Sequence, residues 1–313
     1  MRGKTTLENV MARVHEMSLN NWDDSIAIED MEFESLNWLL IGNNVYEVRP
    51  SAQRLIANKL RIPLQYLSRC PGDLQAVNLN HWLRQQEKER DSFFCRFDGH
   101  ALRAVFTERY TVLDHTEILS KMVEQDFPTS AEVHVSLDET LMVLKVPEYS
   151  RSFVLNGEKD KVVPGISLAN SEVGVWSFSI SAYFYRLVCS NGLIAKTAVT
   201  SKFKHISRKA LDDFPLVLGQ VIHESQYGER RFLLSMETPV ENPINTMASF
   251  NRQFQLTQKQ AKAVEQAWEF ERGNTMFHVM NAYTRAAQDS LLTAEESYHL
   301  ERVGGQILAL VRP

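Results

Sequence analysis

The segment ISLANSEVGVWSFSISAYFYRLVCSNGLIAK, residues 166–196, decides the fold because it holds the most regular pattern in the chain. Apolar and polar side chains alternate along its middle, and successive side chains of a β-strand point to opposite faces. The apolar face carries Trp176, Phe178, Ile180, Ala182 and Phe184. The polar face carries Ser177, Ser179, Ser181, Tyr183 and Tyr185. The pattern predicts a half-buried strand whose serines and tyrosines face solvent.

The end of this segment predicts a hairpin. Asn191-Gly192 is a preferred pair for a two-residue type I′ turn, which would return a second strand with Ile180 opposite Phe203. Alternatively, Asn191 caps a short helix that begins at Gly192. Neither interpretation changes the run of basic residues that surrounds and follows Asn191-Gly192.

This run reverses the charge of an otherwise acidic chain, because residues 186–209 contain no Asp or Glu. Its basic residues are Arg186, Lys196, Lys202, Lys204, Arg208 and Lys209. Lysine and arginine neutralise phosphates, and tyrosine rings offer faces on which bases stack. The six basic residues with Tyr183 and Tyr185 therefore predict a binding surface for a single-stranded nucleic acid. The alternative is a solvated edge strand that its lysines protect from aggregation.

The rest of the chain predicts an α+β fold. Residues 1–90 form a mostly helical N-terminal part, with a helix–turn–helix outline at 51–70. Residues 91–225 form the α+β core, a central antiparallel-rich sheet with a packed helix, and residues 226–313 form a helical C-terminal part. Within the core, Asp98-Gly99 predicts a hairpin that pairs Cys95 with Leu102, and Asp114 with Glu117 predicts a capping box.

Composition limits the class of protein. A hydrophobic content of 44% is that of a packed globular chain, and a net charge of −5 excludes a protein that coats nucleic acid with its whole surface. The three cysteines have no paired spacing, which favours a reducing compartment. No segment resembles a signal peptide or a membrane span, so we expect a soluble, cytoplasmic protein that does not bind membranes.

Enzymatic interpretations are less favoured. The sequence has no phosphate-binding glycine loop and no histidines with metal-ligand spacing, so we expect no cofactor and no metal. Cys189 and His205 lack the surroundings of a catalytic pair. Glu172 is left open between a turn contact and a metal or hydrogen-bonding role. We therefore expect a protein without catalytic activity, and no catalytic residue is assigned.

Four stretches carry a resemblance to a known family. They are LRIPLQYLSRCPGDLQAVNLNHWLR, RAVFTERYTVLDHTEIL, GISLANSEVGVWSFSISAYFYRLVCSNGLI and NTMFHVMNAYTRAA. The chain resembles a family of phage, plasmid and prophage proteins described as a domain of unknown function. The motif residues that carry the resemblance are Asn170, Ser171, Glu172, Gly174, Asn191 and Gly192.

The family is distantly similar, at the level of fold, to single-strand annealing proteins of the RecT and Rad types. This similarity implies strand annealing in recombination without ATP, by a homo-oligomer or ring. Apolar residues of the C-terminal part also exceed what one sheet needs: Phe277, Tyr283, Leu291, Leu292 and Tyr298. The alternative is a phage counter-defence factor that binds a host protein.

Overall fold

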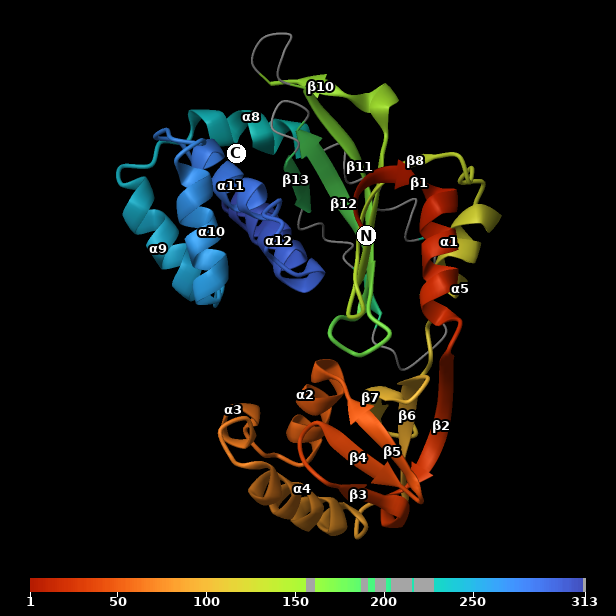
Figure 1. The fold of residues 1–313 in the computed structure, drawn as a ribbon. Coiled ribbons are helices and arrows are strands. Elements are labelled where there is room, and N and C mark those ends of the chain that lie inside the picture. Colours follow the sequence, from red (N-terminus) through yellow and green to blue (C-terminus); the bar gives the residue numbers. More distant parts are fainter. Residues whose placement is uncertain (156–160, 187–190, 195–200, 204–215, 217–227, 312–313) are drawn as a thin grey trace.

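The computed structural model describes residues 1–155, 161–186, 191–194, 201–203, 216 and 228–311. It contains two β-sheets, each with its own helices (Figure 1). The α+β class predicted from the sequence is confirmed. The chain starts in the larger sheet, crosses to the smaller one at β2, and returns after β7 (Figure 1).

The larger sheet has eight strands in the order β1-β8-β9-β11-β12-β13, with β10 beside β11 and β14 beside β12. All of its pairings are antiparallel. The strands are β1 (Arg2–Thr6), β8 (Glu132–Leu137), β9 (Met142–Pro147), β10 (Phe153–Val154), β11 (Lys161–Asn170), β12 (Phe178–Arg186), β13 (Asn191–Ile194) and β14 (Ser201–Phe203). The long strand β12 agrees with the sequence pattern.

Helices cover both faces of this sheet (Figure 1). One face packs against α1 (Leu7–Ser18) and α5 (His115–Glu124). The C-terminal helices are α8 (Gly228–Glu237), α9 (Pro243–Gln253), α10 (Gln258–Trp268), α11 (Met276–Ala286) and α12 (Ala294–Leu310). Of these, α12 covers the opposite face of the sheet, while Phe232 of α8 packs against Phe184. Capping boxes start α10 at Thr257 and α12 at Thr293, where the threonine hydroxyl accepts a backbone N–H and a side chain three residues on returns the bond.

The smaller sheet has the order β2-β6-β7-β5-β4-β3 and forms a separate core with its helices. Its strands are β2 (Asn21–Ala27), β3 (Met31–Phe33), β4 (Trp38–Ile41), β5 (Asn44–Val48), β6 (Ser92–Asp98) and β7 (Ala101–Phe106). Its helices are α2 (Pro50–Lys59), α3 (Leu64–Leu67) and α4 (Gly72–Gln86); short 3₁₀ turns are η1 (Ile28–Asp30) and, beside the larger sheet, η2 (Tyr149–Arg151). The N-terminal part is thus less helical than the sequence pattern predicted. Its strands β2 and β5 pair with β6 and β7 from beyond residue 90, which a local pattern does not reveal.

The hairpin of β6 and β7 exists, but its predicted register is wrong. Asp98 pairs with Ala101, so the turn falls one residue later than predicted, with Gly99 at a φ of +54°. A bulge between Arg96 and Phe97 shifts the register again, and Cys95 lies opposite Val105 instead of Leu102. The bulge adds one residue to one strand, which changes every later pairing.

The predicted turn at Asn191-Gly192 is also wrong. Both residues lie in β13, where Gly192 is opposite Tyr185, so they neither turn a hairpin nor cap a helix. In β14, Phe203 lies opposite Phe178 rather than Ile180. This shift of two residues preserves the faces, because side chains alternate with a period of two.

Candidate functional site

The polar face of β12 is buried, which corrects the expectation that it faces solvent. Tyr183 is 1% exposed and Tyr185 is 9% exposed, and Ser179 and Ser181 are also buried. The cover is α12, whose Tyr298 shares a core cluster with both tyrosines. A strand with alternating polarity can be buried on both faces when its polar groups find partners, as Ser179 does with the Tyr298 hydroxyl at 3.2 Å.

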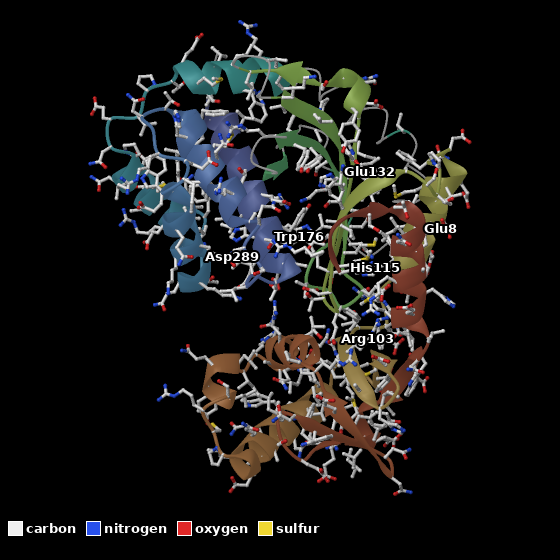
Figure 2. All side chains as sticks on the ribbon, turned by 45° about the horizontal axis from the view of Figure 1, so that its top comes forward. Glu8, Arg103, His115, Glu132, Trp176 and Asp289 are labelled. Carbon is white, nitrogen blue, oxygen red and sulfur yellow. The ribbon has the colours of Figure 1, made fainter. Side chains whose placement is uncertain are left out.

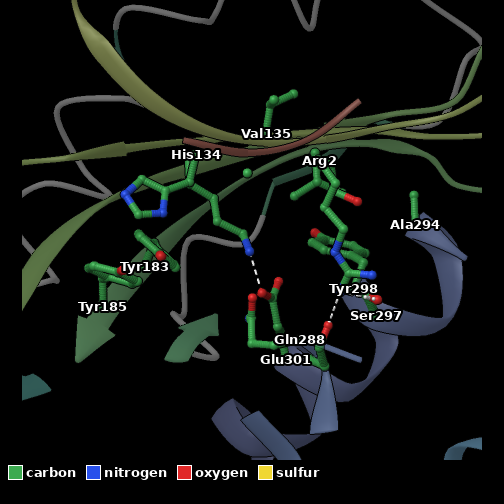
Figure 3. A pocket seen from close by; sticks show the side chains of 15 residues that line it. Arg2, His134, Val135, Tyr183, Tyr185, Gln288, Ala294, Ser297, Tyr298 and Glu301 are labelled. Atoms are coloured by element: carbon green, nitrogen blue, oxygen red, sulfur yellow. Dashed lines mark hydrogen bonds and ion pairs between the residues drawn. The ribbon is translucent and has the colours of Figure 1, made fainter. Parts of the chain in front are cut away.

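A small polar cavity of ≈ 70 Å³ separates this face from α12 (Figure 3). Lys145 and Glu301 form a buried ion pair across it, and the Lys145 Nζ lies 5.3 Å from the centre of the Tyr183 ring. Burial raises the pKa of the Glu301 carboxyl, and the Lys145 ammonium opposes this rise. Arg2 of β1 reaches the same helix and donates to the Ser297 hydroxyl at 2.9 Å. These contacts fix α12 to the sheet rather than leave the tyrosines open to bases.

His134 lies at the edge of this cavity, in edge-to-face contact with Tyr185 at 4.4 Å between ring centres. Among the described residues, its buried Nε2 has no hydrogen-bond partner. Burial lowers the pKa of His134 to about 4, with help from the charges of Lys145 and Lys4. The imidazole is therefore neutral at neutral pH.

The lowered pKa of His134 predicts acid sensitivity. The unfolded chain binds a proton at this histidine below about pH 6.5, whereas the folded protein binds it only below about pH 4. Stability should therefore fall as the pH drops from 6.5 to 4, by about 1–2 kcal/mol after allowance for partial solvent screening. Urea titrations of the wild type and of His134→Gln at several pH values measure this effect. An equal acid loss in both proteins would contradict it.

The predicted basic residues are only partly placed. Arg186 is directed to the C-terminal helices, where its guanidinium lies 3.5 Å from Glu271 and 4.9 Å from the centre of the Phe277 ring. Lys202 lies in β14, with its Cα opposite that of Ser179. The remaining basic residues, Lys196, Lys204, Arg208 and Lys209, lie outside the described residues, as do Cys189 and His205.

The motif at the end of β11 shapes the backbone of the turn that follows. Gly174 has a φ of +73°, and a Cβ on it would lie 2.7 Å from the Phe106 ring. The Ser171 hydroxyl accepts the N–H groups of Val173 and Val175, which closes the turn. Asn170 is fully buried and donates to the Leu113 carbonyl at 3.0 Å. These residues carry β11 into the junction between the two sheets.

Glu172 is the centre of a buried charge network at this junction. Its Oε2 accepts from Arg103 at 3.1 Å, and its Oε1 accepts the backbone N–H of His115 at 2.8 Å. The carboxylate thereby caps α5 in place of the predicted Asp114 capping box, because Asp114 instead binds Arg96 at 2.6 Å. Burial opposes the ionisation of Glu172, but the Arg103 guanidinium and the hydrogen bond from the His115 backbone N–H lower its pKa to about 2. Of the roles that the sequence left open for Glu172, a hydrogen-bonding role is the one seen in the structure.

His115 beside this network is neutral. Burial lowers its pKa, against the attraction of Glu172. Asn170 places its amide NH₂ group 3.0 Å from the His115 Nδ1, and the same group donates to a carbonyl, so Nδ1 accepts the bond. The proton of the neutral ring is therefore on Nε2.

A second cavity, of ≈ 140 Å³, opens beside this network. Arg103 and His115, which lie where the two sheets meet, are both in its wall (Figure 2). The rest of the lining comes from α1, β2, the start of α2, β6, the β8–β9 turn and the segment after β11: Arg13, Val14, Met17, Ser18, Asn21, Arg49, Asp98, Asp138, Glu139 and Glu172. The cavity therefore joins both halves of the molecule.

The buried charges were not found by sequence reasoning, although a signal exists. Arg96, Arg103 and Lys145 each interrupt an otherwise apolar strand, and each is less than 9% exposed. A charge in such a run is almost never buried without a partner, so it predicts an ion pair. The partners Glu172 and Glu301 come from distant segments, which the spacing of residues does not predict.

The comparisons place the chain in a family. The family model described as Domain of unknown function (DUF932) matches residues 103–297, more than half of the chain. The protein therefore belongs to this family. Its matched region includes Arg103, His115 and Glu172. No match was found among curated proteins or among solved structures.

Two further observations concern the described residues alone. No described helix is long and apolar enough to cross a membrane. Within the described ranges, no group of three or more His, Cys, Asp or Glu side chains is placed to hold a metal ion.

Proposed function

We propose that the protein binds single-stranded DNA and anneals complementary strands in phage or plasmid recombination, in the bacterial cytoplasm and without ATP. The observation that carries the proposal is the acid-free run of six basic residues between positions 186 and 209. The described parts of this run, β13 and β14, both pair with β12 at the end of the larger sheet. A basic segment at the end of a sheet can follow a sugar–phosphate backbone.

We propose contacts with the phosphates of the strand. Stacking of bases on the tyrosines of β12 is not part of the proposal. Tyr183 and Tyr185 are buried under α12, so no base can reach their rings while this helix is in place. Arg186 is also assigned to the protein interior by its contact with Glu271. The lysines at 196, 202 and 204, with Arg208 and Lys209, are the proposed phosphate ligands.

A lysine pair tests this proposal. Lys202→Ala with Lys204→Ala should weaken single-strand binding and flatten the slope of log affinity against log salt by about 0.7 for each phosphate that is no longer neutralised. Tyr185→Phe is the matched control and should leave both quantities unchanged, because the ring is retained in its buried site. Wild-type affinity and slope in the lysine variant would overturn the proposed contacts. Titration of RNA of the same sequence, in parallel, measures whether the protein prefers DNA to RNA.

The proposal includes assembly into a homo-oligomer or ring. Fewer exposed apolar side chains support it than the sequence suggested. Phe277, Tyr283, Leu292 and Tyr298 are each at most 5% exposed within one chain, so only Leu291 of the predicted excess, at 76%, is free to contact another copy. The proposed homo-oligomer or ring therefore rests on the fold-level similarity to annealing proteins. Light scattering with and without DNA tests it, and a strict monomer in both would contradict it.

A specific observation favours the second candidate, a factor that binds a host protein. Leu74, Val77 and Trp82 of α4 are 40%, 65% and 46% exposed, and Tyr66 of α3 is 46% exposed. Exposed large apolar side chains such as these can contact a protein partner. A protein that binds neither single-stranded nor duplex DNA, and that no longer binds its host partner in Val77→Ser with Trp82→Ser, would favour this candidate.

A further inference from the structure

Arg302 of α12 carries a charge that no described residue neutralises. Its guanidinium lies over two aromatic rings, 4.9 Å from the centre of the Trp176 ring and 5.9 Å from that of Tyr298. It forms no hydrogen bond and no ion pair with a described residue. Among the described residues, the buried side-chain nitrogens that lack a partner all belong to other side chains. The free N–H donors of Arg302 therefore reach solvent.

The carboxylates of α12 are not available to Arg302. Each of them pairs with a cation from another element: Glu295 with Arg54 at 3.3 Å, Glu296 with Lys259 at 2.8 Å, and Glu301 with Lys145. Within Ala294–Leu310, Arg302 is the only lysine or arginine. Its charge also acts on His299, whose pKa is lowered by burial and further by Arg302. The helix thus presents one uncompensated positive charge.

The two aromatic rings hold this guanidinium in place. Tyr298 is 1% exposed, and its hydroxyl lies 3.2 Å from the Ser179 hydroxyl. Trp176, beside α12 in Figure 2, meets the Tyr298 ring edge to face with 5.2 Å between centres. A guanidinium that already lies against fixed rings loses less conformational freedom when a ligand binds. Its planar fork of N–H donors matches the oxygens of an oxyanion, above all a phosphate or a carboxylate.

The position of Arg302 favours a phosphate. Trp176 lies two residues before β12, and Ser179, which contacts Tyr298, is near the start of that strand. β14 pairs with the same end of β12, where Lys202 lies opposite Ser179. Arg302 and the basic run of the proposed function therefore lie at the same end of β12. Two cationic elements at one end of a strand suit a polyanion better than a single carboxylate.

We propose that Arg302 binds a phosphate of the single strand. The inference rests on the proposed function and extends its phosphate ligands from the run of residues 186–209 to α12. Trp176 and Tyr298 position the guanidinium and do not themselves contact a base. Because a phosphate carries no sequence information, the contact should strengthen the binding of every base sequence equally.

Fluorescence anisotropy with labelled oligodeoxythymidylate and oligodeoxyadenylate over a salt series tests this contact. Arg302→Gln should weaken the binding of both oligomers about tenfold, as expected for the loss of a hydrogen bond to a charged group. It should also flatten the slope of log affinity against log salt by about 0.7, the value for one phosphate. Arg302→Lys retains the charge and should retain the slope, but an ammonium lacks the planar fork and should bind more weakly than the wild type.

Arg285→Gln is the matched control. Arg285 also lies over an aromatic ring, 4.5 Å from the centre of Phe270, but its guanidinium pairs with Glu271 at 3.2 Å. Its removal should leave the affinity and the slope unchanged. Arg302→Gln should fold, since Arg302 has no described hydrogen bond to lose, and circular dichroism of each variant checks this.

Wild-type affinity and slope in Arg302→Gln would overturn the inference and leave the proposed function intact, as would a loss of affinity without a change of slope. A loss that differs between the two oligomers would indicate a base contact and would also overturn it. Should Arg302→Gln fail to fold, wild-type affinity in Arg302→Lys would do the same. No binding of either oligomer to the wild type would overturn both the inference and the proposed function. An effect of Arg302→Gln without one of Lys202→Ala with Lys204→Ala would support Arg302 as a phosphate ligand and overturn the contacts proposed for the lysines.

Discussion

Replacement of Glu172 by alanine is expected to lower the free energy of unfolding by about 3–5 kcal/mol. The change removes the carboxylate that pairs with Arg103, whose side chain is 9% exposed, and leaves a buried positive charge without compensation. It also removes the acceptor for the first N–H of α5. Denaturant unfolding of the purified variant measures the loss.

Glu139→Ala is the matched control for this experiment. Glu139 lines the same cavity and pairs with Arg49 at 3.4 Å, but its side chain is 68% exposed. The free energy of unfolding should change by about 0.5 kcal/mol or less, since exposed pairs contribute little. A Glu172→Ala loss no larger than that of Glu139→Ala would show that the buried network does not stabilise the junction.

Gly174→Val is expected to destabilise the protein by about 2–5 kcal/mol, through two separate costs. A φ of +73° is unfavourable for a β-branched residue, and a Cβ would lie 2.7 Å from the Phe106 ring. Phe106 is itself stacked on Tyr110 with 3.7 Å between ring centres, so it has little room to move. The midpoint of thermal unfolding reports the combined cost.

Gly42→Val isolates the backbone cost. Gly42 has a φ of +59°, but a Cβ there would have no atom within 4 Å. The loss should therefore be about 1–2 kcal/mol, the conformational part alone. If Gly42→Val and Gly174→Val were equally destabilising, the close approach to Phe106 would contribute nothing.

Local patterns in the sequence predict the elements of this fold better than their partners. The alternation along residues 176–185 correctly predicts β12, and Thr257 and Thr293 precede α10 and α12, as caps should. Alternation does not show what covers each face. The serines and tyrosines of β12 resemble a solvated surface, yet α12, more than a hundred residues later, buries them.

In the candidate site, too, local features can be predicted from the sequence, whereas tertiary partners cannot. Gly174 is predictable because only a glycine tolerates both the positive φ and the nearby ring. The role of Glu172 is not predictable, because its partners Arg103 and His115 are brought to it by tertiary packing. The bulge at Arg96 likewise leaves no local sequence signal, although it decides which residues of β7 face Cys95.

Fluorescence anisotropy with labelled single-stranded and duplex oligonucleotides over a salt series tests the central claim most directly. We expect the wild-type protein to bind the single strand more tightly than the duplex, without nucleotide or metal. The logarithm of the affinity should fall linearly with the logarithm of the salt concentration, as phosphate contacts require. No binding of the single strand at low salt, or an affinity that salt does not change, would contradict the account.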